Sequence, residues 1–298
     1  QFTHAEVEST MDGLDAQSGT GPDLLPTRIL KLCSAQLAAP IQRLANLILD
    51  SGAWPECWRI HWVAPIHKRS AVFLPQNYRG IHLTAQLSKV IERLLLSRMS
   101  AHISMRKLAG LNQFAYTKDK GARDVLALLT LRWVKAVDAG SKVLVYCSDV
   151  AGAFDKVAKK RLLDKLTAMG LHKKLIDKIS SWLAPRKASV VVGGKESEPF
   201  EIKDMIFQGT VLGPQLWNLF FADAATAIQE HFFEEAIYAD DLNANKTVKS
   251  DTHVEQRMTL IDNVQTELHT CSAAIRVTCL PPQSLTHIPS RPDPFGSA

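Results

Sequence analysis

The chain has 298 residues, of which 46% are hydrophobic and 22% charged, and its formal net charge is +5. This length allows one large or two modest domains with real cores, and the composition is typical of a globular protein. No apolar run approaches the ~18 residues of a membrane-spanning helix, so no membrane association is expected. The chain begins with Gln1 rather than Met, and we expect it to be a segment of a longer protein.

Cysteine usage excludes two classes of small stabilised domain. The five cysteines are an odd number and show no Cys-x-x-Cys spacing; they are Cys33, Cys57, Cys147, Cys271 and Cys279. A zinc site and a disulfide framework are both disfavoured, and an intracellular, reducing compartment is expected.

Positive charge is concentrated in one region. Residues 156–187 hold ten Lys and Arg against two acids, a local charge of +8 that suits a polyanion. The alternative is a pair of helices whose lysines face water. The ten are Lys156, Lys159, Lys160, Arg161, Lys165, Lys173, Lys174, Lys178, Arg186 and Lys187.

The first third of the chain predicts helices followed by a hairpin. A capping box, Thr3 with Glu6, predicts a short N-terminal helix. Apolar residues at helical spacing predict a helix over 27–51, which Pro40 is expected to kink or split. An extended region follows, and we expect a hairpin of strands 60–66 and 78–83.

The remaining elements mix helices and hairpins. Helices are predicted over 86–103, 121–138, 253–270 and, as a basic pair, within 158–184. A second hairpin is expected over 188–206 with Gly193-Gly194 as its turn, and a further helix from Pro214. Extended chain is expected at 275–279. Because no βαβαβ rhythm is present, the predicted class is α+β.

The acidic stretch near residue 240 is the strongest local signal. Apolar residues lead into Asp240 and Asp241, and a second extended run, 242–248, leads out. This pattern predicts a tight hairpin with two adjacent carboxylates at its turn. Neighbouring carboxylates repel, and their burial is costly without a cation. Ordinary turn chemistry is the alternative.

A second strand supplies a matching acid. The apolar run 142–149 ends at Asp149 and can pair with the acidic hairpin. Three such carboxylates, shared between two Mg²⁺ ions ~4 Å apart, make a site for in-line phosphoryl or nucleotidyl transfer.

An ordered set of sequence blocks points to one family. Over roughly residues 18–295, the chain resembles the reverse transcriptase domain of a non-LTR (LINE-like) retrotransposon. The blocks are 18–23, 58–68, 77–81 (Asn-Tyr-Arg-Gly-Ile), 89–93 (Lys-Val-Ile-Glu-Arg), Gln113-Phe114, 149–155, 208–214 and 238–241 (Tyr-Ala-Asp-Asp).

The resemblance implies a right-hand polymerase with fingers and an antiparallel palm sheet. We expect residues 1–50 to be a helical segment leading into the fingers and 51–140 to form the fingers. Residues 141–290 are expected to form the palm, with interleaved fingers-type elements allowed. Residues 291–298 are expected to be a truncated end with the thumb missing.

The implied activity is RNA-directed DNA synthesis, in which dNTPs are added to a primer 3′-hydroxyl. The catalytic metal ligands would be Asp149, Asp240 and Asp241, with the backbone carbonyl of Val150, and the cofactor two Mg²⁺ ions, for which Mn²⁺ can substitute. The implied partners are an RNA template, a DNA primer and the rest of a retroelement polyprotein. That rest would include a thumb, with or without an endonuclease. A eukaryotic retroelement would place the chain in the nucleus or cytoplasm.

The resemblance also assigns nucleotide contacts. Phe154 resembles the steric gate that rejects a 2′-hydroxyl, and Gln208 and Gly209 resemble the loop beside the incoming nucleotide. Arg79 and Lys68 resemble cations that hold the triphosphate. Each has a plainer alternative: a packed core ring, an ordinary turn or surface charge.

The basic region would follow the template or primer backbone without reading bases. The lysines assigned to this contact are Lys156, Lys159, Lys160, Lys173 and Lys174.

Several positions depart from the family pattern, among them Gly80, Ala115 and the pair Cys271-Ser272. Gly213 stands where the family usually has Ser, and Gln283 falls near the Lys expected to protonate pyrophosphate. Gln cannot act as a general acid. The alternative function is therefore a catalytically impaired or degenerate retroelement fragment with residual nucleic-acid binding.

Overall fold

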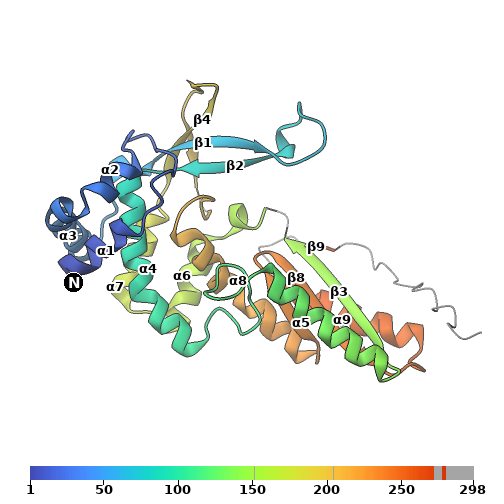
Figure 1. Cartoon of the computed structure of the whole chain (residues 1–298). Helices are drawn as coiled ribbons and strands as arrows, with labels where there is room; N and C mark the ends of the chain where they lie inside the picture. Colours follow the sequence, from blue (N-terminus) through green and yellow to red (C-terminus); the bar gives the residue numbers. More distant parts are fainter. Residues whose placement is uncertain (151, 204, 272–276, 280–298) are drawn as a thin grey trace, which may run out of the picture.

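The computed structural model describes residues 1–150, 152–203, 205–271 and 277–279. Two sheets lie at different ends of the molecule, with helices between and around them (Figure 1). The mixture of helices and largely antiparallel strands agrees with the predicted α+β class. Gln283 lies outside the described residues.

The described residues form helices and strands in this order. The α-helices are α1 (His4–Asp12), α2 (Thr27–Leu32), α3 (Ser34–Ser51), α4 (Gln86–Arg106), α5 (Ala122–Asp138), α6 (Lys159–Ala168), α7 (Lys173–Trp182), α8 (Leu212–Glu230) and α9 (Val254–Cys271). The strands are β1 (Ile60–His67), β2 (Tyr78–Leu83), β3 (Lys142–Val150), β4 (Arg186–Val192), β5 (Lys195–Glu196), β6 (Phe200–Ile202), β7 (Glu234–Tyr238), β8 (Asp241–Val248) and β9 (Val277–Cys279).

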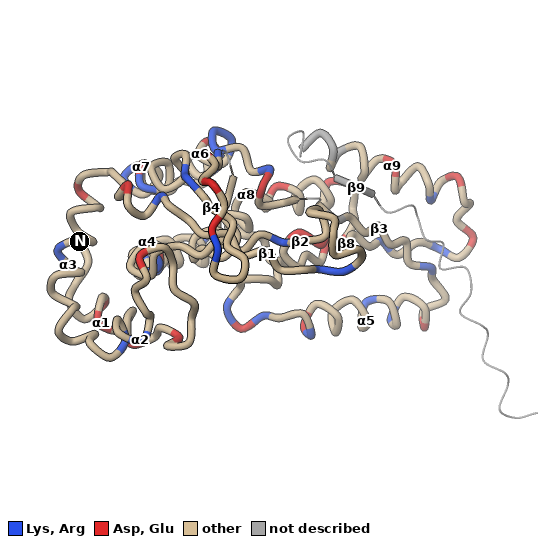
Figure 2. Tube along the Cα trace, turned by 90° about the horizontal axis from the view of Figure 1, so that it is seen from above, with Lys and Arg blue, Asp and Glu red and all other residues tan. Residues whose placement is uncertain are grey.

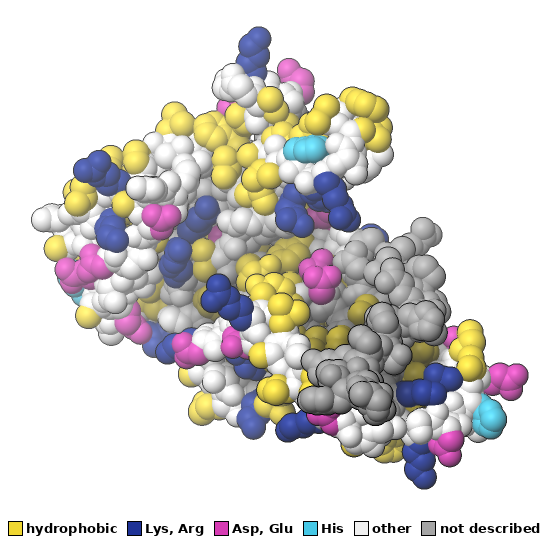
Figure 3. Space-filling view, turned by 45° about the vertical axis from the view of Figure 1, so that its right-hand side comes forward, with side chains coloured by type: hydrophobic (Ala, Val, Ile, Leu, Met, Phe, Trp, Pro, Cys, Tyr) yellow, Lys and Arg dark blue, Asp and Glu magenta, His cyan; other side chains and the backbone are white. Residues whose placement is uncertain are grey.

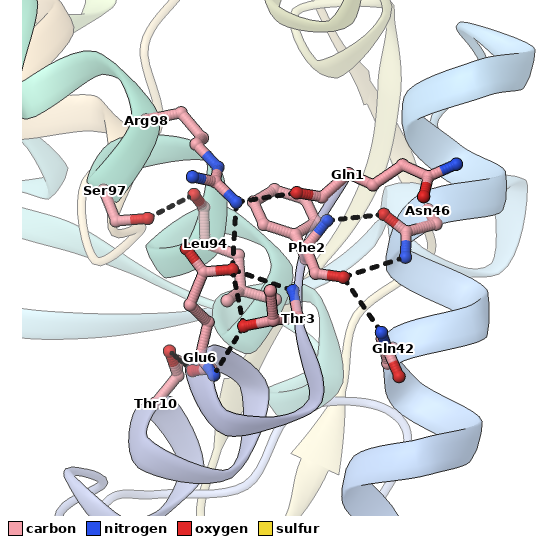
Figure 4. Close-up of polar contacts among 10 residues, drawn as sticks. All are labelled: Gln1, Phe2, Thr3, Glu6, Thr10, Gln42, Asn46, Leu94, Ser97 and Arg98. Carbon is pink, nitrogen blue, oxygen red and sulfur yellow. Dashed lines mark hydrogen bonds and ion pairs between the residues drawn. The ribbon is translucent and has the colours of Figure 1, made fainter.

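The N-terminal helix is fixed by a cap and by contacts to two other helices. Thr3 and Glu6 form the predicted capping box of α1. Phe2 is 2% exposed, and its backbone N–H donates to Asn46 Oδ1 of α3 at 2.7 Å (Figure 4). Arg98 of α4 lies over the Phe2 ring and pairs with Glu6 at 2.9 Å. The burial of Phe2 therefore joins α1 to both α3 and α4.

The helix predicted over 27–51 is split, but not at the predicted residue. The break falls at Cys33, between α2 and α3, and Pro40 lies inside α3. The prediction that Pro40 splits this run was wrong. A proline within a helix removes one backbone hydrogen bond, and α3 tolerates this loss because it packs against α1 and α2.

The first sheet combines both predicted hairpins. Strand β1 pairs antiparallel with β2, as expected, and parallel with β4. Gly193 (φ 57°) and Gly194 (φ 75°) turn the chain from β4 into β5, which suits a type I′ turn. The return strand is shorter than predicted, because β5 and β6 are separate and β6 ends at Ile202. This sheet therefore draws on both sides of the expected boundary at residue 140.

The second sheet is antiparallel, in the order β7-β8-β3-β9. Helices α5 and α9 flank it on either side in the view from above (Figure 2). Helix α5 packs on β3 and β7, while α9 packs on β3 and on α8.

Helix α8 lies at the centre of the molecule. Twelve of its 19 residues are buried, on all sides of the helix. The helix begins at Leu212, so Pro214 is its third residue and not its first, as had been predicted. Proline is tolerated there because the backbone N–H groups of the first helical turn have no acceptor within the helix. No helix in the described part of the chain is long and apolar enough to cross a membrane.

Candidate active site

The predicted acidic hairpin is present. Tyr238 pairs with Asp241, which leaves Ala239 and Asp240 as a two-residue loop between β7 and β8; we call residues 238–241 the acidic turn. Ala239 has φ 59°, a left-handed conformation that costs a non-glycine residue roughly 1–2 kcal/mol. Asp240 is half-buried and Asp241 is exposed.

The end of β3 lies beside the acidic turn. In the antiparallel pairing of β3 with β8, Ser148 is opposite Leu242. The next residue of β3 is Asp149 and the preceding residue of β8 is Asp241, so their backbones lie at neighbouring positions of the same sheet. On its other side, Asp149 pairs with Thr278 and Val150 with Val277. The structure thus brings the three predicted acidic positions to one end of the second sheet.

The donor chemistry at this end suits a hard divalent cation. Mg²⁺ prefers carboxylate and carbonyl oxygens, and this end of the sheet offers both. The half-burial of Asp240 next to Asp241 also favours a bound cation, since two adjacent carboxylates repel each other. The described side chains alone, which do not include that of Asp149, form no group of three metal-binding residues. The residues present therefore fit a site whose third carboxylate comes from β3.

Side chains from outside the hairpin hold the acidic turn. Gln113 Oε1 accepts the Ala239 N–H at 3.1 Å, and Gln113 Nε2 donates to the Ala239 carbonyl at 3.3 Å. Trp217 Nε1 of α8 donates to the same carbonyl at 2.9 Å. The segment 112–115 also runs along β7, with hydrogen bonds from Phe114 N to Ile237 O and from Ile237 N to Asn112 O. The turn is thus fixed on two sides.

The β1–β2 hairpin projects over a hollow in the surface, and Lys and Arg side chains lie on its underside (Figure 3). Burial raises the pKa of Tyr116, the charge of Asp240 adds to the increase, and that of Arg79 opposes it. Tyr116 therefore lies within electrostatic range of both Arg79 and the acidic turn.

Lys68 has an acidic neighbour of its own. Burial raises the pKa of the Asp155 carboxyl, and the charges of Lys68 and Lys156 oppose that increase. Asp155 follows shortly after β3, in the 3₁₀ turn Phe154–Lys156. Lys68 thus lies within electrostatic range of Asp155, and Arg79, from the same hairpin, within range of Tyr116.

Phe154 is 8% exposed and belongs to the main core. Its ring is stacked on that of Trp217, with 5.8 Å between centroids and an interplanar angle of 16°. Its carbonyl accepts a hydrogen bond from Ile206 N at 2.9 Å. A gate role for Phe154 remains a prediction, and the packing shows that any such ring is backed by Trp217.

The loop containing Gln208 and Gly209 is tied to β2. His82 N donates to the Gln208 carbonyl at 2.7 Å. Gly209 has φ 97°, and a Cβ there would lie 2.6 Å from the His82 carbonyl oxygen. The close approach that Gly209 permits in this structure is therefore to β2, while its contact with a nucleotide remains a prediction.

Glu92, within one of the family blocks, holds the same loop from the other side. It is fully buried, and its Oε2 accepts the N–H groups of Val211 at 2.7 Å and Leu212 at 3.1 Å. A carboxylate at the start of α8 also interacts favourably with the helix dipole. The 89–93 block thus positions the 208–214 block.

The basic region is smaller at the surface than its sequence indicates. Arg186 is 1% exposed and Lys178 is 4% exposed, so neither can contribute to a surface for a polyanion. Lys165 is largely buried and pairs with Asp223. The surface charge of the region is therefore lower than the +8 of its sequence, because Arg186 and Lys178 are buried by packing.

The five assigned lysines are at least partly exposed, and Lys and Arg are frequent around α6 and α7 in Figure 2. Lys160 pairs with Asp164 and Lys173 with Asp177, both at i,i+4 spacing. These pairs are equally typical of solvated helix faces. The nucleic-acid contact remains a prediction.

Several residues of the site have no counterpart in the sequence-based assignment. The sequence analysis did not single out Trp217 or Tyr116. It also did not assign the specific roles of Gln113 and Glu92. Gln113 and Glu92 lie in blocks that had been recognised, which was the available signal. In the sequence, Trp217 cannot be distinguished from the other apolar residues of its helix. Its hydrogen bond to the acidic turn becomes apparent only in the folded structure.

Comparison with known proteins decides the family. Residues 66–276, more than half of the chain, match the family described as reverse transcriptase (RNA-dependent DNA polymerase). The chain belongs to the reverse transcriptase family. The expected resemblance is thereby confirmed.

The curated relatives of this reverse transcriptase chain come from mobile elements. It is 28% identical over 245 residues to the RNA-directed DNA polymerase from mobile element jockey of Drosophila melanogaster. It is 30% identical over 250 residues to that of Drosophila funebris, and 27% over 243 residues to the probable RNA-directed DNA polymerase from transposon BS. Each match covers 80% of this chain and 27% of the relative. The chain thus spans about a quarter of the length of these relatives.

Proposed function

We propose that this chain is the polymerase part of a retroelement reverse transcriptase and copies RNA into DNA by adding dNTPs to a primer 3′-hydroxyl. The observation that carries the proposal is the acidic turn beside the end of β3 in a chain of this family. The first sheet would be the fingers and the second sheet the palm. A thumb and any endonuclease would belong to the rest of a longer polyprotein.

In this proposal the carboxylates of Asp149, Asp240 and Asp241 and the carbonyl of Val150 hold two divalent ions, Mg²⁺ or Mn²⁺. Bound there, the ions would lower the pKa of the primer hydroxyl and stabilise charge on the triphosphate. The protein's own contribution is to hold these oxygens in place. The acidic turn suits that task because its backbone is fixed by Gln113 and Trp217.

The nucleotide would enter between the two sheets. Arg79 and Lys68 would bind its phosphates, because guanidinium and ammonium groups pair well with phosphate oxygens. Both lie within electrostatic range of acids or phenols on the opposite side, as the pKa shifts of Tyr116 and Asp155 indicate. Phe154 would lie under the sugar and exclude a 2′-hydroxyl, with Gln208 and Gly209 alongside.

Template and primer would contact the exposed lysines of the basic region, which include Lys156 and Lys159. Such contacts to phosphates make binding salt-sensitive and independent of base sequence. An intracellular, reducing location is part of the same proposal. It is supported by the three cysteines that the structure describes as free thiols, Cys33, Cys57 and Cys147.

The test is primer extension on a poly(rA)/oligo(dT) template with Mg²⁺ and labelled dTTP. We expect incorporation that disappears with EDTA and falls at least 100-fold in a D240N/D241N variant. The matched control is Asp251→Asn, which makes the same chemical change at an exposed turn beyond the far end of β8. This variant should retain the parent's rate.

Two results would contradict the proposal. One is a D240N/D241N variant as active as the parent. The other is a folded protein that incorporates nothing, alone or within a longer chain carrying the native downstream sequence, yet binds RNA in a salt-dependent way. The second result would support the degenerate fragment instead.

A further inference from the structure

Ala239 connects the acidic turn to the interior of the protein. Its N–H and its carbonyl are both hydrogen-bonded to side chains that lie outside the hairpin, and the residue itself is 8% exposed. Its backbone is also in a left-handed conformation, which two-residue hairpin loops favour but which is costly for an alanine. The side-chain hydrogen bonds therefore help to hold a conformation that the sequence of the loop does not favour.

Gln113 cannot easily change its part in this arrangement. It is 2% exposed, and its Oε1 accepts a second N–H, that of Ala115, at 3.0 Å. Because the amide oxygen accepts two N–H groups, its orientation is determined and Nε2 faces the Ala239 carbonyl. Asn218 Nδ2 of α8 donates to the Ala115 carbonyl at 2.9 Å, which anchors this segment to the central helix.

Trp217 links the acidic turn to a second part of the site. Its indole N–H bonds Ala239, while its ring lies against the rings of Phe154 and Phe221. Phe221 is stacked on it at 5.1 Å, and Trp217 is fully buried. One side chain thus contacts both the loop that carries Asp240 and the ring assigned to the sugar.

We propose that Gln113 and Trp217 are positioning residues of the polymerase site: they fix the acidic turn relative to Phe154, and so set the placement of the carboxylates together with sugar selection. This inference rests on the proposed function. Neither residue touches the reacting atoms. Their effect follows from preorganisation, since catalytic groups must be held near their working geometry by surrounding hydrogen bonds and packing.

The decisive variant is Trp217→Phe. It keeps an aromatic ring between Phe154 and Phe221 and removes the N–H that bonds Ala239. The matched control is Trp54→Phe. Trp54 is 2% exposed, and its Nε1 is buried with no hydrogen-bond partner in the described part of the chain. Both variants lose similar aromatic volume from a core, but only Trp217→Phe removes a hydrogen bond to the acidic turn.

Three quantities separate a positioning role from a purely structural one. We expect Trp217→Phe to lower kcat about tenfold with a smaller change in the KM for dTTP, and to reduce the preference for dTTP over UTP several-fold. The melting temperatures of the two Phe variants should be similar. Trp54→Phe should keep the parent's kcat and sugar preference.

A measurement without turnover gives an independent readout. Mn²⁺ binding, followed by electron paramagnetic resonance, should be several-fold weaker in Trp217→Phe than in the parent or Trp54→Phe. If an active parent loses nothing in kcat, sugar preference or Mn²⁺ affinity on Trp217→Phe, the inference is overturned while the proposed function stands. If the parent neither incorporates dTTP nor binds Mn²⁺, both are overturned together.

Discussion

At the scale of single residues, two glycines show how little room the loop before α8 has. Gly209 combines a positive φ with a carbonyl 2.6 Å from where its Cβ would be. At Gly213, a Cβ would lie 2.8 Å from Thr210 Oγ1 and 2.9 Å from Ile206 Cγ2. The departure from the usual Ser at this position thus coincides with packing that leaves no space for a side chain.

We predict that Gly209→Ala destabilises the protein by about 2–4 kcal/mol, the sum of backbone strain and a clash with β2. Gly110→Ala is the control, because Gly110 has φ 83° with no atom within 4 Å of its would-be Cβ, and only the strain remains. Urea unfolding of the three proteins measures the difference. If both variants lost the same free energy of unfolding, the clash with the His82 carbonyl would be relieved by a small shift that does not destabilise the protein.

Residue chemistry alone predicted the acidic turn but not the burial of the basic residues Arg186 and Lys178. Asp240 and Asp241 stand out because adjacent acids between apolar runs are unusual and because turns are local in sequence. The burial of Arg186 could not be recognised from the local sequence, since only Trp182 among its contacts is close in sequence, while His61 and Phe207 are not. Arg186 donates to His61 at 2.6 Å and lies over the rings of Trp182 and Phe207.

At the scale of elements, the start of α8 depends on α4. Two of the first backbone N–H groups at this end are satisfied by Glu92 rather than by a side chain of the local sequence. Asp23 acts similarly for α4, because its Oδ2 accepts the Gln86 N–H at 3.1 Å. Both capping acids belong to sequence blocks on which the resemblance to the family was recognised, so these blocks carry structural information.

We predict that Glu92→Leu costs about 3–5 kcal/mol, since it leaves two buried N–H groups and the Ser88 hydroxyl without an acceptor. Glu92→Gln should cost only about 1 kcal/mol, because its amide oxygen can still accept both N–H groups. Chemical denaturation provides the comparison. A leucine variant no less stable than the glutamine variant would refute this account of the cap.

Local elements were largely predictable, whereas their long-range pairings were not. Short stretches of sequence were enough to predict two of these elements. They are the helix over 86–103, from its hydrophobic periodicity, and the turn at Gly193-Gly194, from its residue types. The parallel pairing of β1 with β4 joins residues more than 120 positions apart, and the bridge between Gln113 and Ile237 does the same. Neither hydrophobic periodicity nor turn residues predict such contacts, because the contacts depend on how the apolar faces of distant helices and strands pack together.

At the scale of the whole molecule, a buried polar cluster joins the first sheet to the central helices. Arg186 of β4 donates to His61 Nε2 of β1, and His61 Nδ1 lies 3.1 Å from His82 Nδ1 of β2. For both contacts to be hydrogen bonds, each histidine must be neutral, with His61 donating to His82. The ring of Phe207 packs against both histidines.

This cluster predicts a loss of stability in mild acid. Burial, followed by the charge of Arg186, lowers the pKa of His61 to about 2 and that of His82 to about 4. The unfolded chain takes up protons at both histidines below about pH 6.5, whereas the folded protein does not, so stability falls as the pH decreases. The loss should approach roughly 2 kcal/mol per histidine at pH 5, and it should be negligible above pH 7.

Unfolding by urea at several pH values between 7.5 and 4.5 measures this effect, and two variants assign it. His82→Gln keeps an acceptor for the His61 N–H and removes one titrating ring, so the dependence on pH should fall to about half. His253→Gln removes an exposed histidine of the loop before α9 and should leave the dependence unchanged. If the parent were equally stable at pH 7 and pH 5, both histidines would have to take up protons in the folded state as well. The hydrogen-bonded chain from Arg186 to His82 could not then hold the first sheet as described.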